Sequence, residues 1–111
     1  MSFARHLIIS GYLGLCMVGA VESHAAPDGA ALYEHYCIPC HGPDGRARTP
    51  AARKLGAKDL TASKLTDAEI VHQIAEGKKD PGGKERMPAF KATLAEPEIA
   101  ALVGFVKGLR K

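Results

Sequence analysis

The sequence predicts a small all-α domain, on three observations. Apolar side chains recur at helical spacing from residue 29 into residues 37–41, over 66–76 and over 96–109. Strand-like alternation never extends beyond a few residues. The chain has 111 residues, which is enough for one domain. Its 12 Gly and 7 Pro, with only 5% aromatics, indicate that long loops join the helices.

The first helix is expected to begin at Gly29 and to continue into residues 37–41. Asp28 is a suitable N-cap for it. Leu32, Tyr33 and Tyr36 follow at helical spacing and form its core side. Glycine is costly inside a helix, so Gly29 suggests that another backbone comes close to it.

The middle of the chain is predicted to be a long loop followed by a second helix. Residues 42–60 lack sustained periodicity, apart from one expected helical turn over 51–55. The second helix spans 66–76, because Thr66 and Glu69 have the spacing of a capping box. Its buried side is expected to hold Ile70, Val71 and Ile74.

A polar loop over 78–86 leads to Met87, and a final helix is expected over 96–109. The chain has Ala95 at the position before this helix, so Thr93 and Glu96 are expected to cap it one turn earlier. The core-facing stripe consists of Ile99, Leu102, Val103, Val106 and Leu109.

The amino terminus has the features of an export signal. Arg5 and His6 precede an apolar run over 7–21, and small residues follow at 23–25. We expect cleavage after Ala25, which would remove residues 1–25 and leave a domain of residues 26–111. The alternative is an uncleaved anchor, although the apolar run of about 15 residues is shorter than the roughly 20 that a spanning helix needs.

The motif Cys37-Ile38-Pro39-Cys40-His41 carries the chemistry of the chain. Two thiols with a two-residue spacer and a following imidazole are typical of c-type haem attachment. A zinc site would need further ligands with their own spacing, and a redox dithiol would need a βαβ setting. A structural disulfide is the remaining alternative. One covalently bound haem c, attached through Cys37 and Cys40, is the reading we adopt.

The size of the domain agrees with a bound cofactor. About 86 residues remain after residue 25, which is few for a self-sufficient hydrophobic core. Small domains usually need an additional staple, and a covalently held haem would provide one. The net charge of +3 is too small to indicate a nucleic-acid partner.

If His41 binds the iron on one side, Met87 is the best candidate for the other side. It is the only methionine after residue 25, and Pro88 would stiffen the backbone that presents its sulfur. A thioether ligand raises the reduction potential of haem iron. Packing in the core is the alternative role for this methionine. His35 and His72 are the rival ligands, and both are expected to face solvent.

This arrangement resembles the class I monohaem cytochromes c, in particular the small exported bacterial types. The resemblance covers nearly all of residues 26–111. It rests on Gly29, Tyr33, Cys37, Cys40, His41, Gly42, Met87, Pro88, Leu102 and Phe105.

The resemblance implies a small cytochrome c fold, with three main helices and long loops wrapped around the haem. Gly29 and Tyr33 of the first helix would meet Leu102 and Phe105 of the last. A proline carbonyl, matched here by Pro50, would bind the imidazole N–H of the axial histidine.

The expected function is that of a soluble periplasmic electron carrier, not an enzyme, which cycles between Fe(II) and Fe(III) with His41 and Met87 as axial ligands. We expect a monomer, without stable membrane insertion, that docks transiently with a donor and an acceptor redox protein. The charges expected to steer docking are Arg46, Arg48, Lys78, Lys79, Lys84 and Arg86. The alternatives are a haem c subunit of a larger oxidoreductase complex, and a haem sensor or enzyme with an open sixth position.

Overall fold

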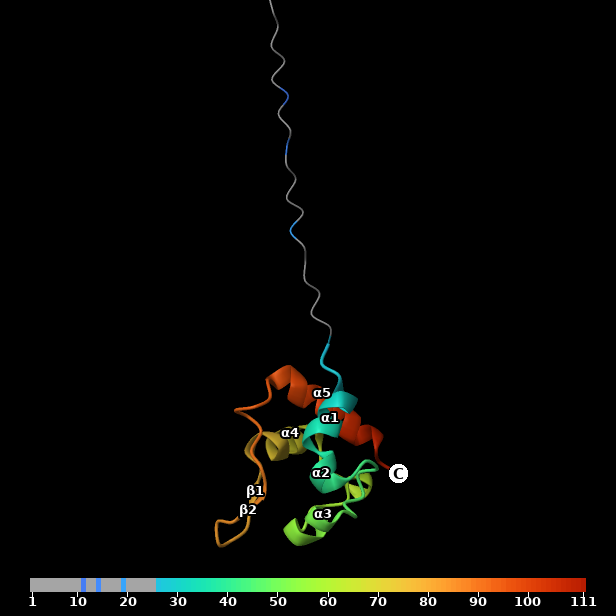
Figure 1. Ribbon diagram of the computed structural model, residues 1–111, viewed down its shortest axis with the longest axis vertical. Coiled ribbons are helices and arrows are strands. Elements are labelled where there is room, and N and C mark those ends of the chain that lie inside the picture. Colours follow the sequence, from blue (N-terminus) through green and yellow to red (C-terminus); the bar gives the residue numbers. More distant parts are fainter. Residues whose placement is uncertain (1–10, 12–13, 15–18, 20–25) are drawn as a thin grey trace, which may run out of the picture.

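The computed structural model describes residues 26–111 together with residues 11, 14 and 19. The expected signal peptide, residues 1–25, lies outside the described residues except for those three positions. The elements are α1 (Gly29–Tyr36), α2 (Ile38–His41), α3 (Pro50–Leu55), the 3-10 helix η1 (Leu60–Ala62), α4 (Asp67–Glu76), β1 (Lys78–Lys79), β2 (Glu85–Met87) and α5 (Glu96–Gly108). Figure 1 shows their arrangement. In the described part of the chain, no helix has the length and apolar character needed to cross a membrane.

The helices agree with the predicted pattern and add to it. The three predicted helices correspond to α1, α4 and α5, while the first is interrupted at Cys37, after which α2 begins. The expected turn inside the long loop is α3, which starts at Pro50. Thr49 caps it, since its Oγ1 accepts a hydrogen bond from the Ala52 N–H at 3.0 Å.

The prediction of an all-α domain is wrong for residues 78–87. There β1 and β2 pair antiparallel, with Lys78 opposite Met87 and Lys79 opposite Glu85. The turn between them is held by Asp80, which accepts the Gly83 N–H on its carbonyl at 2.9 Å and donates its own N–H to the Lys84 carbonyl at 2.9 Å. Each strand has only two or three residues, so its alternation is too short to be recognised in the sequence.

The centre of the domain is the contact between its first and last helices. In Figure 1, α1 crosses α5. Tyr33 of α1 and Leu102 of α5 belong to one buried cluster and are 1% and 0% exposed. The Tyr33 and Phe105 rings lie 4.7 Å apart, centroid to centroid. A Cβ on Gly29 would collide with the Ala101 carbonyl oxygen and lie 3.2 Å from Phe105 Cβ. The expected close approach at Gly29 is therefore confirmed.

The second predicted helix is confirmed at both ends. Thr66 Oγ1 accepts the Glu69 N–H at 3.2 Å, and the Glu69 carboxylate accepts the Thr66 N–H at 3.0 Å. The helix ends at Gly77, which has a φ of 68°. Ile70 and Ile74 are buried, but Val71 is 40% exposed. The placement of Val71 on the buried side was wrong, because the face turned to α5 is narrower than the run of apolar residues.

The final helix starts where it was predicted to start, but its capping differs from the prediction. The helix begins at Glu96, with Ala95 in the capping position, so Thr93 does not cap it. The Glu98 carboxylate instead accepts the Ala95 N–H at 2.9 Å. Because alanine has no side-chain oxygen, this is the reciprocal half of a capping box. The core-facing stripe is as expected, with Ile99, Leu102, Val103 and Val106 buried.

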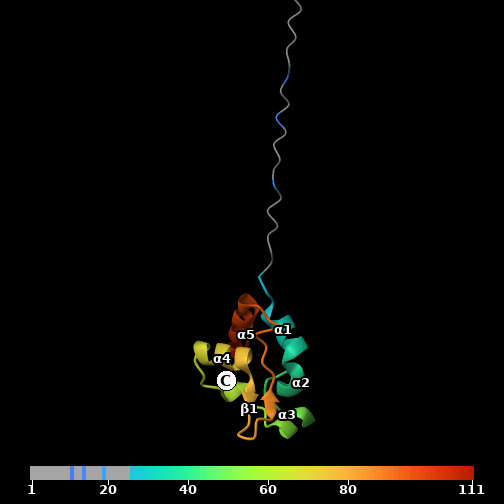
Figure 2. The same ribbon diagram turned by 90° about the vertical axis from the view of Figure 1, so that its left-hand side faces the viewer.

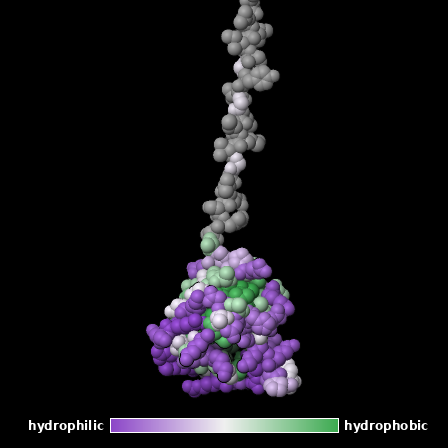
Figure 3. Space-filling view, turned by 180° about the vertical axis from the view of Figure 1, so that it is seen from behind, coloured by the Kyte–Doolittle hydropathy of each residue, from purple (hydrophilic) through white to green (hydrophobic). Residues whose placement is uncertain are grey.

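The surface of the described part is mainly polar. Figure 3 shows one face as largely hydrophilic, with a limited hydrophobic area close to where the chain enters the domain. Leu65 and Val71 are the large hydrophobic side chains that are exposed, at 39% and 40%. Two surface ion pairs hold outer parts of the fold together, Lys107 to Asp67 at 2.8 Å and Lys91 to Glu76 at 3.0 Å.

The crossing at Gly29 can be tested by comparing two helical glycines. We expect Gly29→Ala to lower the free energy of unfolding by about 1–3 kcal/mol, because the new methyl group overlaps the Ala101 carbonyl. Gly104→Ala is the matched control: it lies in α5 with nothing within 4 Å of its Cβ position, and it should raise stability by about 0.5–1 kcal/mol. Urea unfolding measures both, and equal effects would contradict the close approach.

Candidate haem site

The two motif cysteines lie on one tight turn. Cys37 is buried and Cys40 is half-buried, and both thiols are free. The Cys37 carbonyl accepts the Cys40 N–H at 3.2 Å and the His41 N–H at 2.8 Å. These bonds hold the two thiols and the imidazole on a single helical turn.

The surroundings of Cys37 do not suit a redox dithiol. Burial, together with the neighbouring Cys40, raises the pKa of Cys37 to about 11. Its thiol is therefore protonated at neutral pH, whereas the nucleophile of a disulfide oxidoreductase must be a thiolate. This observation weakens the dithiol alternative.

The His41 ring is oriented by a backbone carbonyl. Its Nδ1 lies 3.1 Å from the Lys58 carbonyl oxygen. With Nδ1 as the donor, Nε2 carries the lone pair that a metal requires. Pro50 was the expected partner and this was wrong: Pro50 is the first residue of α3, where carbonyls accept the intrahelical bonds. Lys58 lies after that helix, where its carbonyl is available.

Burial also fixes the charge state of His41. It lowers the pKa of the imidazole below the usual value, and the hydrogen bond to Lys58 opposes this only in part. The ring is therefore neutral at pH 7, which is the form that binds a metal.

Met87 is presented by a separate part of the chain. It is the last residue of β2, it is half-buried, and it packs against the buried core cluster. The backbone of Gly77 packs closely against the backbone of Met87 and Pro88. A Cβ on Gly77 would collide with the Met87 carbonyl oxygen and lie 2.7 Å from the Pro88 carbonyl. Figure 1 and Figure 2 show β1 and β2 as a segment separate from α2.

The rival ligands lie on the surface. His35 and His72 are exposed, as expected, and His35 packs edge-on against Tyr36 with centroids 4.5 Å apart. Among the described residues, no three His, Cys, Asp or Glu side chains are grouped so that they can hold a metal ion. A zinc ion bound by protein side chains alone thus has no ligand set in this part of the chain.

The donors present fit haem. A porphyrin supplies four ligands to its iron itself, so the protein needs one or two axial donors and, for haem c, two thiols. Cys37 and Cys40 provide free thiols, and His41 provides a neutral imidazole whose ring is oriented by Lys58. Met87, which is half-buried at the end of β2, provides a thioether as a second axial donor.

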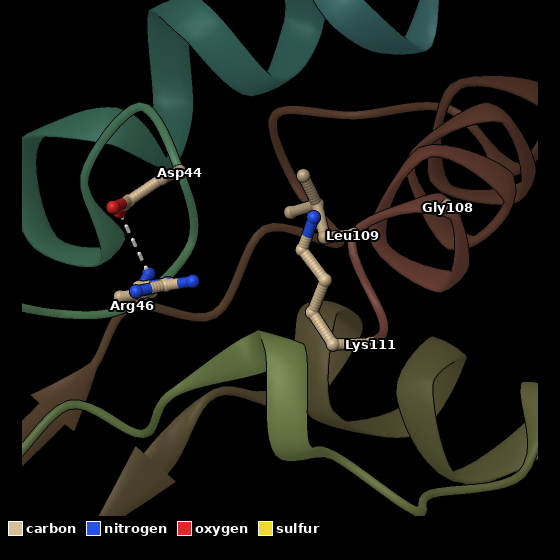
Figure 4. A pocket seen from close by; sticks show the side chains of 5 residues that line it. All are labelled: Asp44, Arg46, Gly108, Leu109 and Lys111. Atoms are coloured by element: carbon tan, nitrogen blue, oxygen red, sulfur yellow. Dashed lines mark hydrogen bonds between the residues drawn. The ribbon is translucent and has the colours of Figure 1, made fainter.

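Two cavities lie apart from these residues. One of about 260 Å³ is lined by Asp44, Arg46, Gly108, Leu109 and Lys111, and Figure 4 shows the Asp44 carboxylate accepting the Arg46 N–H, at 3.0 Å. The other, of about 320 Å³, is lined by Leu65, Ala68, Glu69, His72 and Gln73. Neither contains a cysteine, His41 or Met87.

Three residues that support the site were missed or misassigned from the sequence. Lys58 orients His41, and Gly77 supports Met87. Thr49 donates from Oγ1 to the Cys40 carbonyl at 3.3 Å, in addition to capping α3. The pair Thr49-Pro50 is a recognisable signal for a helix start, and Gly77, directly after the second predicted helix, is a recognisable signal for a helix end.

Comparisons with known proteins agree with this chemistry. The family model described as cytochrome c oxidase, cbb3-type, subunit III matches residues 24–106. A solved structure titled KustC0563 c-type cytochrome is 38% identical, with a TM-score of 0.65, over 76% of this chain and 99% of that one. A tyrosine-to-phenylalanine variant of KustC0563 is 36% identical, with a TM-score of 0.63, over 75% and 99%. No curated protein matches.

Fold and donor set together define a small c-type cytochrome, and the resemblance to monohaem cytochromes c is confirmed. The chain belongs to the family described as cytochrome c oxidase, cbb3-type, subunit III. It is accordingly a cytochrome c-type electron-transfer protein, with haem c as the cofactor that the family implies.

The support of Met87 by Gly77 can be tested with a second glycine. Gly77 and Gly83 have φ values of 68° and 84°, so alanine is strained at both. Only Gly77 contacts the Met87-Pro88 backbone, while nothing lies within 4 Å of the Cβ position at Gly83. We expect Gly77→Ala to lower the unfolding free energy by about 1–3 kcal/mol more than Gly83→Ala. Urea unfolding of both variants gives the difference, which should vanish if the contact is unimportant.

Proposed function

We propose that the chain is a single-electron carrier with one covalently bound haem c, with His41 and Met87 as its axial ligands. The observation that supports this best is the turn at residues 37–41. There two free thiols stand beside a neutral imidazole whose Nδ1 is bound by the Lys58 carbonyl. No other part of the described chain combines these groups.

Each residue has a defined task in this proposal. Cys37 and Cys40 provide the sulfur atoms of two thioether bonds. Bound haem supplies the one-electron Fe(II)/Fe(III) couple. The Lys58 carbonyl keeps the His41 ring in one orientation and makes Nε2 a stronger donor. Met87 provides a soft thioether, which favours the reduced state. A carrier of this kind makes and breaks no substrate bond.

The proposed place of work is the periplasm. The basic residues before the apolar run over 7–21, and the small residues over 23–25, support export with cleavage after Ala25. The folded domain would then be a soluble monomer of residues 26–111. Its basic loop residues support transient docking with redox proteins through electrostatic steering.

A second function is favoured by the family description, which names an oxidase subunit. In that case the chain would pass electrons within a larger complex. Against this, the matched part makes up 99% of the chain of the solved KustC0563 cytochrome, so a domain of this size is found there as a chain of its own.

Gel filtration of the native protein from its source distinguishes the two functions. We expect elution at the size of one domain, because the face in Figure 3 is largely hydrophilic and, among the described residues, the exposed large hydrophobic side chains are Leu65 and Val71. Recombinant residues 26–111 with haem attached serve as the size standard. Elution of the native protein together with other redox subunits would favour the complex.

Haem attachment and signal cleavage can be tested by the intact mass of the exported protein. We expect the mass of residues 26–111 plus one haem. The double variant Cys37→Ser, Cys40→Ser should show no added haem mass, because no thiol of the motif remains to form a thioether bond. A mass that shows no haem, or that includes residues 1–25, would contradict attachment or cleavage respectively.

The role of Met87 can be tested by Met87→Leu, which removes the sulfur and nearly preserves the volume. A volume-conserving swap costs less than about 1.5 kcal/mol, so the fold should persist. We expect the reduction potential to fall and the ferric protein to bind added imidazole, because one axial position has opened. A potential and a visible spectrum like those of the unaltered protein would show that Met87 only packs, and would favour a sensor or an enzyme.

A further inference from the structure

We propose that Arg86 is a positioning residue for Met87. Its guanidinium joins the β1–β2 hairpin, which carries Met87, to α3, which is bonded to the Cys37–His41 turn. It thereby holds the hairpin with Met87 against α3 and, through α3, against the turn with His41. The inference rests on the proposed function, since it requires Met87 to be an axial ligand.

The hairpin presents a fixed carboxylate to Arg86. Asp80 Oδ1 accepts the Lys84 N–H at 2.9 Å, which locks the turn. The other oxygen, Oδ2, accepts Arg86 Nε at 3.2 Å and lies 3.1 Å from Nη2. The two side chains are only 24% and 33% exposed, so this pair is better shielded than the other two ion pairs of the described chain. Arg86 is therefore held in one orientation.

The third guanidinium nitrogen of Arg86 contacts α3. Nη1 donates to the Lys54 carbonyl oxygen at 3.4 Å. Lys54 is in the last turn of α3, where carbonyls have no intrahelical partner and where a cation is favourable. Within the described residues, this is the one hydrogen bond that joins 78–88 to 37–60. Figures 1 and 2 both show α3 and the hairpin at the same end of the domain.

The segment around α3 is in turn bonded to the motif. Thr49, which caps α3, donates to the Cys40 carbonyl at 3.3 Å, and Lys58, just after α3, binds His41 Nδ1. A continuous chain of contacts thus runs from Met87 through Arg86 and α3 to His41. On its other side the hairpin is anchored to α4, where the Ile74 carbonyl accepts the Phe90 N–H at 3.0 Å. Loss of Arg86 should therefore loosen Met87 without unfolding the domain.

The consequence is measurable as competition for the iron. If the hairpin separates from α3 more easily, Met87 leaves the iron more often, and an external ligand binds the ferric protein more tightly. A partly shielded ion pair with one additional hydrogen bond predicts that imidazole binds Arg86→Ala about three- to tenfold more tightly.

The experiment titrates imidazole into the ferric holoprotein and follows the visible charge-transfer absorption of methionine-ligated haem. Two controls match the change. Lys84→Ala removes a positive charge from the same hairpin, where the Lys84 side chain has no hydrogen bond or ion pair with described residues. Lys107→Ala breaks the ion pair to Asp67 between α5 and α4, away from the hairpin.

We expect tighter imidazole binding in Arg86→Ala alone, with both controls like the unaltered protein. An affinity of Arg86→Ala equal to that of Lys84→Ala, or a similar gain in Lys107→Ala, would overturn the positioning role, since charge or general stability would then explain the effect. Met87→Leu separates this failure from that of the proposed function. If Met87→Leu retains the unaltered spectrum, Met87 is no ligand and both proposals fail. If the spectrum of Met87→Leu changes but Arg86→Ala binds imidazole no more tightly than the controls, the role of Arg86 alone fails.

Discussion

The rest of the structure depends on the contact between α1 and α5. These two helices approach so closely at Gly29 that a methyl group would strike the Ala101 carbonyl, and Tyr33 and Leu102 lose nearly all exposure there. Tyr33 also donates from its hydroxyl to the Gly42 carbonyl at 2.6 Å, directly after His41. The helix crossing thus fixes the end of the motif turn as well as the core. Burial raises the pKa of Tyr33 to about 12, so this bond persists at any ordinary pH.

The candidate ligands are each held by a backbone group from another segment. Lys58 orients His41, and the Gly77 backbone lies against Met87. Both supports come from residues that follow a helix end, where the chain leaves helical geometry and can turn a carbonyl or a bare Cα toward a neighbour. Because the domain has several short helices, it has several helix ends, and two of these supply the backbone groups that contact His41 and Met87.

The sequence predicted those features that depend on local chemistry. The spacing of Cys37, Cys40 and His41, the capping box at Thr66 and the need for Gly29 follow from neighbouring residues or from the properties of a single amino acid. The partner of His41 did not follow: Pro50 and Lys58 both lie within residues 42–60, which were predicted to form one long loop, and only the folded path of this segment decides which carbonyl reaches the ring. The hairpin was missed because strands of two and three residues carry almost no periodicity, although Asp80-Pro81-Gly82-Gly83 is a strong turn signal. Val71 shows that an apolar residue beside the buried stripe need not belong to it.

The α1–α5 contact also has a consequence for the order of assembly. Tyr33 and Phe105 stand near opposite ends of the domain in sequence, and loop closure over such a distance must precede the contact. The partner of α1 is synthesised long after it, so the nascent chain cannot bury Tyr33 until α5 has emerged. Until then Tyr33, whose hydroxyl donates to the Gly42 carbonyl at the end of the Cys37–His41 turn, lacks the helix that covers it. A chain truncated before Leu102 would accordingly leave Tyr33 uncovered, and proteolysis would remove it instead of leaving a shortened domain.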